Sequence, residues 1–172
     1  PILLERGETA RKRKETVDRF WNGGSLQSDS NVQFGEGGAG TFSDGKLNTG
    51  VKDPAGRGRL VLQTFVQAGA PEEILYWNKP HLGTDVLIGV VEHIRQEIED
   101  LGGQVYFDTQ LVDIEIREGQ VCGVYTRKSG EPVGEASYLE TEVLVLAIGH
   151  SARDTFAMLR DRKIPMERKA FA

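Results

Sequence analysis

A glycine-rich segment from Gly35 to Gly50 holds many of the residues that could do chemistry. Six of its sixteen residues are glycine, a density that helices and strands do not tolerate. Its hydroxyl and ammonium side chains include Thr41, Ser43 and Lys46. Together with exposed backbone N–H groups, they suit a ligand that is anionic or heteroaromatic. Because Phe34, Phe42 and Leu47 supply apolar anchors, we expect a ligand-binding loop rather than a solvated one.

Two phosphate-binding patterns overlap in this segment. Gly35 to Gly40 matches G-x-G-x-x-G, but that motif ends a strand and opens a helix, whereas turn residues continue here through Asp53-Pro54. We therefore do not interpret it as a Rossmann turn. Gly40 to Lys46 matches the first seven positions of the P-loop, G-x-x-x-x-G-K, but the eighth residue is Leu47, which has no hydroxyl to hold magnesium. A P-loop-like nucleotide-binding module remains the alternative interpretation.

Two histidines, His81 and His150, are the candidates for acid–base catalysis. Histidine changes its charge near neutral pH, and both residues follow loop signals in the sequence. His93 lies beside Glu92 on a predicted helix, where we expect it at the surface. The three histidines are too dispersed in the sequence to indicate a metal site.

The composition is that of a mildly acidic globular chain. Its 172 residues include 21 Lys and Arg against 26 Asp and Glu, a net charge of −5, which argues against a nucleic-acid partner. The single cysteine, Cys122, excludes a disulfide framework within the chain and fits a reducing, cytoplasmic compartment. We expect its thiol in the core. The longest aliphatic run, Val143 to Ile148, is far shorter than the ~20 residues of a membrane span.

Helical periodicity is clearest from Asp85 to Leu101, where Thr84 or Asp85 can cap the start and Gly102-Gly103 ends the pattern. Further helices are predicted over Glu8–Trp21, Arg59–Ala68 and Pro71–Trp77. The first of these contains the basic run Arg11 to Lys14. Because acidic residues lie within a turn of that run, we interpret it as a solvated helix face.

Strand patterns begin with the apolar residues at the start of the chain and return at Val105 to Phe107. From Thr109 to Glu140 the period is two, which predicts a small antiparallel meander. Val143 to Ile148 is continuously apolar, as in a buried strand of an α/β sheet, and we expect it next to the opening strand. Ser151 and Asp154 resemble a capping box for a helix through Arg162. The chain lacks an initiator methionine, so we expect an internal fragment of a longer protein.

Two segments carry a family resemblance: NVQFGEGGAGTFSDGKL, from Asn31 to Leu47, and KPHLGTD, from Lys79 to Asp85. They closely resemble a family of bacterial uncharacterised FAD-dependent dehydrogenases in the glutathione-reductase-like flavoprotein superfamily. The resemblance extends from Leu4 to Lys169. It implies an α/β fold: a partial Rossmann-like FAD-binding domain, with a parallel sheet and helices. Residues 1–172 would form a fragment of one such domain, with a glycine-rich loop and helical insert at 22–84 and a β-meander at 109–141. The family's own G-x-G-x-x-G turn would lie upstream of Pro1.

The resemblance also assigns roles to residues. Glu5 would accept hydrogen bonds from the adenosine ribose, the backbone of Leu111 and Val112 would touch the adenine, and Ala147 and Gly149 would let the chain pass close to FAD. Lys46 would place positive charge near the flavin N1–C2=O region. The remaining implied cofactor-binding residues are Arg6, Gly37, Gly38, Gly40, Thr41, Ser43, Asp44, Gly45 and Leu47.

The favoured function is an FAD-dependent oxidoreductase that passes a hydride or electrons between the flavin and an unidentified small organic substrate. Lys46, His81 and His150 are its candidate catalytic residues. No cysteine pair is present, which excludes disulfide-reductase chemistry for this segment. The sequence leaves open whether NADH or NADPH reduces the flavin, and which oligomer forms. A noncatalytic flavin-binding protein is a third hypothesis.

Overall fold

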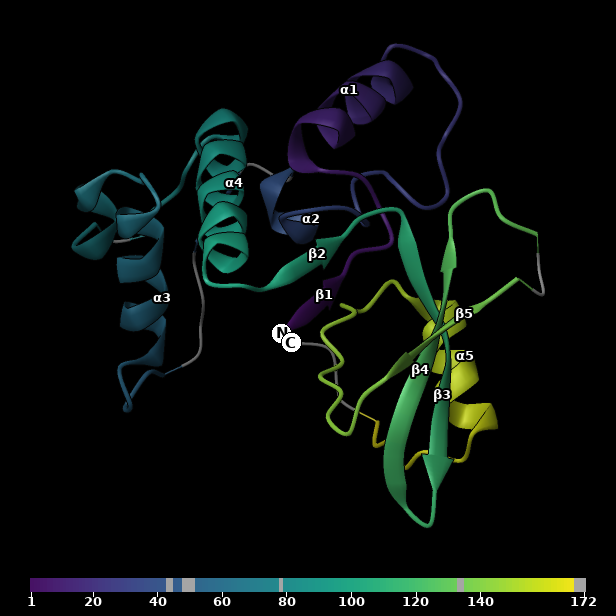
Figure 1. The fold of residues 1–172 in the computed structure, drawn as a ribbon. Helices are drawn as coiled ribbons and strands as arrows, with labels where there is room; N and C mark the ends of the chain where they lie inside the picture. Colours follow the sequence, from purple (N-terminus) through teal and green to yellow (C-terminus); the bar gives the residue numbers. More distant parts are fainter. Residues whose placement is uncertain (43–44, 48–51, 78, 133–134, 169–172) are drawn as a thin grey trace. The chain divides into compact units, whose positions relative to one another are not determined.

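The computed structural model describes residues 1–42, 45–47, 52–77, 79–132 and 135–168. The chain divides into two compact units, Pro1–Asp108 and Thr109–Ala172. The first contains β1 (Ile2–Leu4), α1 (Ala10–Trp21), α2 (Gly38–Thr41), α3 (Arg57–Gln67), the 3-10 helix η1 (Glu72–Leu75), α4 (Thr84–Asp100) and β2 (Gln104–Tyr106). The second contains β3 (Thr109–Arg117), β4 (Gln120–Lys128), β5 (Ser137–Glu140) and α5 (Arg153–Asp161) (Figure 1).

Strands β1 and β2 form a two-stranded parallel sheet in the first unit (Figure 1). The register pairs Ile2 with Gln104 and Leu4 with Tyr106. Parallel strands need a long crossover connection, and here it includes the glycine-rich loop and α4, which leads directly into β2. The chain therefore has a mixed α/β fold, as the sequence pattern predicts.

Helix α4 carries the core of the first unit. Leu87 and Val90 pack with Ala68, Ala70, Ile74 and Leu82 in one cluster, and Ile88 packs with Ala10, Val17 and Phe42 in another. One helix therefore holds α3 and η1 on one side and α1 with the loop on the other. Its predicted extent is confirmed to within a residue at each end.

The ends of α4 follow different rules. At its C-terminus, Gly102 has φ 84°, and Gly103 N–H donates to the Ile98 carbonyl over 2.8 Å, so glycine ends the helix as predicted. At its N-terminus the predicted side-chain cap is wrong. Gly83 is the N-cap, and no side chain bonds the first helical N–H groups. Thr84 is already helical, so its hydroxyl is no longer placed to cap, while Asp85 still lies at the favourable end of the helix dipole.

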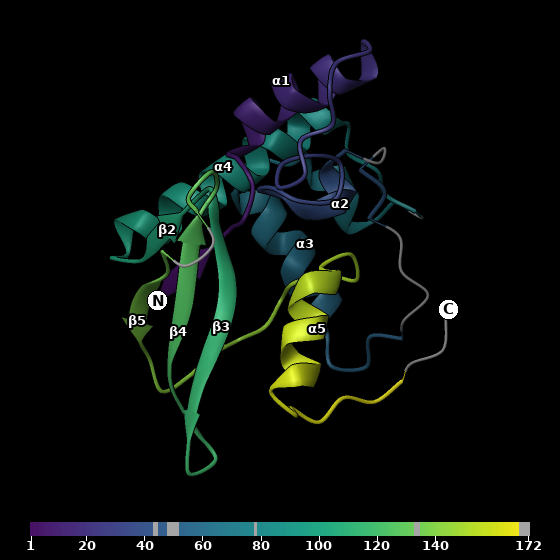
Figure 2. The same cartoon turned by 90° about the vertical axis from the view of Figure 1, so that its right-hand side faces the viewer.

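The second unit is a three-stranded antiparallel meander in the order β3-β4-β5, with α5 beside β3 (Figure 2). Its core joins Ile114 of β3, Val124 of β4 and Leu159 of α5. The meander and the helix were both predicted. The predicted capping box is wrong, because α5 has Ala152 as N-cap without a side-chain cap bond, and Asp154 instead accepts from the N–H of Thr155.

The predicted buried strand from Val143 to Ile148 is wrong. These residues form no regular structure, and Val143 and Val145 are 77% and 81% exposed. A strand needs backbone partners in a neighbouring strand, and no described strand pairs with this segment. An apolar run alone cannot supply those partners, so Val143 and Val145 face solvent, while Leu144 packs on the edge of the core of the second unit.

Among the described residues, no helix combines the length and the apolar character needed to cross a bilayer.

Candidate functional site

Glu5 stands at the carboxyl end of β1, where its backbone N–H still donates to the Tyr106 carbonyl over 2.9 Å. Its carboxylate oxygen Oε1 accepts from the N–H of Gly7 at 2.8 Å and from the N–H of Gly35 at 3.1 Å. The strand end is thereby tied to the glycine-rich loop. Ligands of open α/β sheets bind outside the carboxyl ends of the strands, so Glu5 lies where the sequence places a ligand-binding carboxylate.

The two glycines bonded to Glu5 also touch each other. A Cβ added to Gly7 would lie 2.6 Å from the Gly35 Cα, so only a residue without a side chain fits there. Gly35 itself has φ 120°, a conformation that favours glycine. The loop can approach the strand end this closely because both positions are glycine.

Arg13 is fully buried, which corrects the interpretation of the run from Arg11 to Lys14 as a solvated face. Its Nε donates to the Asn31 carbonyl over 2.8 Å. Its Nη1 donates to the carbonyls of Gly35, Glu36 and Gly38 over 2.7 to 3.1 Å. One turn of α1 therefore faces solvent at Arg11 and the loop backbone at Arg13.

The environment of Arg13 is both apolar and electrostatic. Its guanidinium carbon lies 4.4 Å from the centroid of the Phe42 ring, a cation–π geometry. Burial lowers the pKa of Arg13 to about 10, and the nearby Glu5 carboxylate acts in the opposite direction. The group therefore stays charged at neutral pH. Its Nη2 is buried without a hydrogen-bond partner among the described residues.

Glu36 joins the loop to two helices. Its Oε2 accepts from the N–H of Ala10, the first residue of α1, over 2.7 Å, and its Oε1 accepts from Arg95 Nε of α4 over 2.7 Å. The side chain is only 9% exposed. A carboxylate at a helix N-terminus is favoured by the helix dipole, so Glu36 fixes where the loop meets α1.

Residues Gly37 to Gly40 present an open glycine surface. All four are exposed, and a Cβ at Gly38 or Gly40 would meet no described atom within 4 Å. The segment closes as the four-residue helix α2, and the buried Thr41 hydroxyl donates to the Gly37 carbonyl over 2.8 Å. No strand precedes it among the described residues 5–37, so the interpretation against a Rossmann turn is confirmed.

Lys46 and His81, two of the predicted catalytic residues, are paired in an isolated antiparallel bridge. Leu47 N–H donates to the Pro80 carbonyl over 3.0 Å, and Leu82 N–H donates to the Gly45 carbonyl over 2.9 Å. Both side chains, Lys46 and His81, are exposed. The structure thus brings together two residues that are 35 positions apart in the sequence.

Glycine is required at position 45, where φ is 62° and a Cβ would lie 1.7 Å from the Leu82 carbonyl oxygen. The backbone at Lys46 also differs from that of a P-loop. In a P-loop the lysine opens a helix, whereas Lys46 lies in a bridge and Leu47 packs against the core cluster of α3 and α4.

The predicted apolar anchors of the loop are confirmed. Phe42 is buried in the cluster with Ala10 and Ile88, and Leu47 packs on the other cluster. Phe34 lies under Arg6, whose guanidinium carbon is 4.6 Å from the ring centroid. Two further predicted cofactor-binding residues, Ser43 and Asp44, lie outside the described residues.

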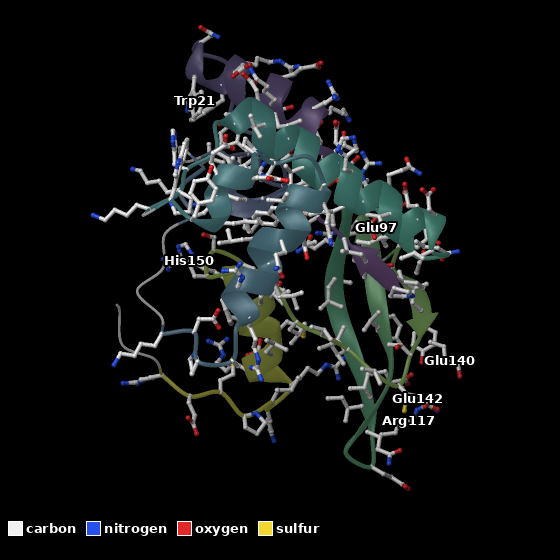
Figure 3. The ribbon with its side chains drawn as sticks, turned by 90° about the vertical axis from the view of Figure 1, so that its left-hand side faces the viewer. Trp21, Glu97, Arg117, Glu140, Glu142 and His150 are labelled. Atoms are coloured by element: carbon white, nitrogen blue, oxygen red, sulfur yellow. The ribbon has the colours of Figure 1, made fainter. Side chains whose placement is uncertain are left out.

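The remaining predicted site residues belong to the second unit. Leu111 and Val112 are half-buried in β3, at an irregularity in the pairing with β4. Ala147 and Gly149 are exposed in the irregular segment before α5. His150 is exposed as well, and its Nε2 lies 3.4 Å from the Ser151 hydroxyl (Figure 3).

The other groups singled out from the sequence lie apart from the loop. His93 is exposed, as expected, and its Nδ1 lies 2.8 Å from the Ala68 carbonyl oxygen. Cys122 is half-buried in β4 rather than in the core. Among the described residues, no group of three or more His, Cys, Asp or Glu side chains could hold a metal ion.

Sequence reasoning missed Arg13 and Glu36 as site residues. A signal for Arg13 was present, since Ala10, Arg13 and Val17 share the i, i+3, i+7 spacing of one helix face, and Ala10 and Val17 are both buried. For Glu36 there was no local signal, because its partners are 26 and 59 positions away.

No family model matches the chain. An uncharacterised protein of Clostridium beijerinckii is 50% identical over all 172 residues. The chain spans 30% of the length of that relative.

Proposed function

We propose that this chain forms part of an FAD-dependent oxidoreductase and binds the cofactor at the carboxyl end of β1. The observation that carries the proposal is the Glu5 carboxylate, held at that strand end by the N–H groups of Gly7 and Gly35. A carboxylate at this position of a parallel sheet is suited to accept from ribose hydroxyls. The close resemblance of Asn31 to Leu47 to bacterial FAD-dependent dehydrogenases points the same way.

The described residues fit the adenosine end of FAD. Glu5 uses Oε1 for the loop, and its Oε2 accepts no hydrogen bond from the described part of the chain, so this oxygen is available to a diol. The exposed backbone from Gly37 to Gly40 carries one small side chain, the methyl of Ala39, so a flat or anionic group can approach it closely. A Rossmann-like sheet in the whole protein would extend the parallel pair of β1 and β2.

When bound, FAD supplies the acceptor for a hydride or an electron pair. The residues of this chain then bind and tune it. Lys46 offers a positive charge that favours a reduced, anionic flavin. His81 is paired with Lys46 through the backbone bridge, and its imidazole can hold or move a proton at its ring nitrogens. His150 is the second candidate for proton transfer. The substrate is a small organic molecule, and NADH or NADPH is the candidate reductant.

The test is the absorption spectrum of the whole protein, with the released chromophore identified by chromatography. We expect a stoichiometric yellow FAD. In titrations followed by flavin fluorescence, Glu5→Gln should weaken FAD binding about tenfold, because one charge-assisted hydrogen bond is lost (~1.4 kcal/mol). Glu15→Gln, on the exposed side of α1, is the matched control and should bind FAD as the unmodified protein does.

Two outcomes would overturn the proposal. A colourless protein that takes up no added FAD, but binds magnesium-ATP and loses that affinity in Lys46→Met, would favour the P-loop-like nucleotide-binding module. Bound FAD that dithionite reduces, but that neither NADH, NADPH nor any organic substrate turns over, would favour a noncatalytic flavin-binding protein.

A further inference from the structure

A single buried side chain holds the first part of the glycine-rich loop. The guanidinium of Arg13 donates to four backbone carbonyls, those of Asn31, Gly35, Glu36 and Gly38, and packs on the ring of Phe42. These bonds reach the backbone between residues 31 and 38, in the second half of the connection from α1 to α2. This stretch forms no strand and no long helix, so its backbone order depends on side-chain contacts such as this one.

Arg13 and Glu5 both bond the backbone of Gly35, at the two peptide groups on either side of its Cα. The N–H of Gly35 donates to Glu5, and its carbonyl accepts from Arg13. A Cβ at Gly35 would lie 2.4 Å from the Arg13 Cδ, so the side chain fits against this glycine without space to spare. The position of the Glu5 carboxylate is therefore coupled to the position of Arg13 through Gly35.

Arginine at this position is not explained by stability alone. The group is a fully buried cation, and its Nη2 finds no hydrogen-bond partner among the described residues. A buried unpaired polar group is destabilising, and an apolar side chain of similar length would avoid that penalty. Lysine could not replace the contact, because its donors radiate from one atom and lack the planar fork that reaches several carbonyls at once. The contact with the loop is what arginine alone provides.

We propose that Arg13 is a positioning residue that shapes the glycine-rich loop before the cofactor arrives, and so sets the Glu5 carboxylate for binding. The part that concerns FAD rests on the proposed function, whereas the part that concerns the loop does not. A loop already ordered by Arg13 loses little conformational entropy when a ligand binds. Without this contact the ligand itself must order the loop, and its affinity falls.

The test uses the whole protein, stripped of any bound flavin, with Arg13→Met, Arg13→Lys and Arg11→Met. Arg11 is the matched control, since it lies on the same helix but its side chain is exposed and, within the described part of the chain, bonds Glu92. Hydrogen exchange of the Gly35 and Gly38 amides reports the loop. We expect at least tenfold faster exchange and at least tenfold weaker FAD binding in Arg13→Met, with partial recovery in Arg13→Lys and no change in Arg11→Met.

The two readouts separate the two proposals. Unchanged exchange of the Gly35 and Gly38 amides in Arg13→Met would overturn the role of Arg13, whether or not FAD binds. Faster exchange in a protein whose unmodified form takes up no FAD would support the role of Arg13 and count against the proposed function. If thermal melting shows that Arg13→Met does not fold, the test uses Arg13→Lys instead. Amide exchange and FAD affinity in Arg13→Lys equal to those of the unmodified protein would then overturn the inference.

Discussion

Replacing Glu36 by alanine removes the carboxylate that ties the glycine-rich loop to α1 and α4. Two charge-assisted contacts disappear together, one from the N–H of Ala10 and one from Arg95, each at 2.7 Å. The Ala10 N–H is buried, so after the substitution it is left without a partner. The Arg95 side chain is 24% exposed and regains some hydration. The substitution is therefore expected to destabilise the first unit mainly through the start of α1.

The magnitude follows from these contacts. Hydrogen bonds to charged groups contribute about 1.5–3 kcal/mol each, and the lower value applies to the contact with Arg95, because that side chain is partly solvated. We expect Glu36→Ala to lower the free energy of unfolding by about 3 kcal/mol. In a double-mutant cycle, Glu36 and Arg95 should show a coupling of about 1–2 kcal/mol.

Urea unfolding followed by circular dichroism measures this change. The matched control is Glu92→Ala, which removes the partner of the exposed Arg11 side chain and should cost less than about 1 kcal/mol. If Glu36→Ala costs no more than Glu92→Ala, or if the cycle with Arg95 gives no coupling, the carboxylate does not hold the loop in solution, and the account of the site given above is wrong.

Three further predictions concern other parts of the chain. The Arg162 guanidinium holds the pKa of Asp113 below its ordinary value. The pair therefore stabilises the second unit above about pH 4, and this small contribution is lost as the pH falls further. Urea unfolding between pH 7 and 3 should show a smaller acid loss in Asp113→Asn. Val145→Thr should change stability by less than about 0.5 kcal/mol, because the side chain is 81% exposed, whereas a cost above about 1 kcal/mol would mean that the segment is buried. Gly45→Ala should lower the free energy of unfolding by more than about 3 kcal/mol, because its Cβ would lie 1.7 Å from a backbone carbonyl oxygen at φ +62°. The control is Gly89→Ala within α4, where a Cβ meets no described atom within 4 Å. This variant should be more stable by about 0.5–1 kcal/mol; thermal unfolding measures both changes.

Much of the local structure was predictable from the sequence. The period of apolar residues from Asp85 to Leu101 indicates α4, and glycine at 102 ends it, because both depend on residues within a few positions of one another. The change to a period of two after Thr109 indicates the meander for the same reason. Apolar residues inside the glycine-rich loop correctly indicated anchors, since a solvated loop has no use for Phe42 in a core.

The errors arose where distant partners decide the outcome. The run Val143 to Ile148 has the composition of a buried strand, yet no described strand pairs with it, and Val143 and Val145 are exposed. Arg13 belongs to a basic run with the composition of a solvated helix face, yet the loop that follows α1 covers its side chain completely. In both cases the neighbours along the chain give the wrong answer, because burial depends on segments that pack from elsewhere.

The sequence by itself therefore determined which segments form helices and which form the meander, and which segment is rich in glycine and open to close approach. These properties follow from local sterics, backbone hydrogen bonding and hydrophobic period. Only the tertiary structure decided that Glu5 and Arg13 both bond the backbone of Gly35, and that Lys46 and His81 meet in one bridge. Those contacts form because α4 and its two apolar clusters fold the loop back onto the end of β1, an arrangement set by long-range packing that no local pattern encodes.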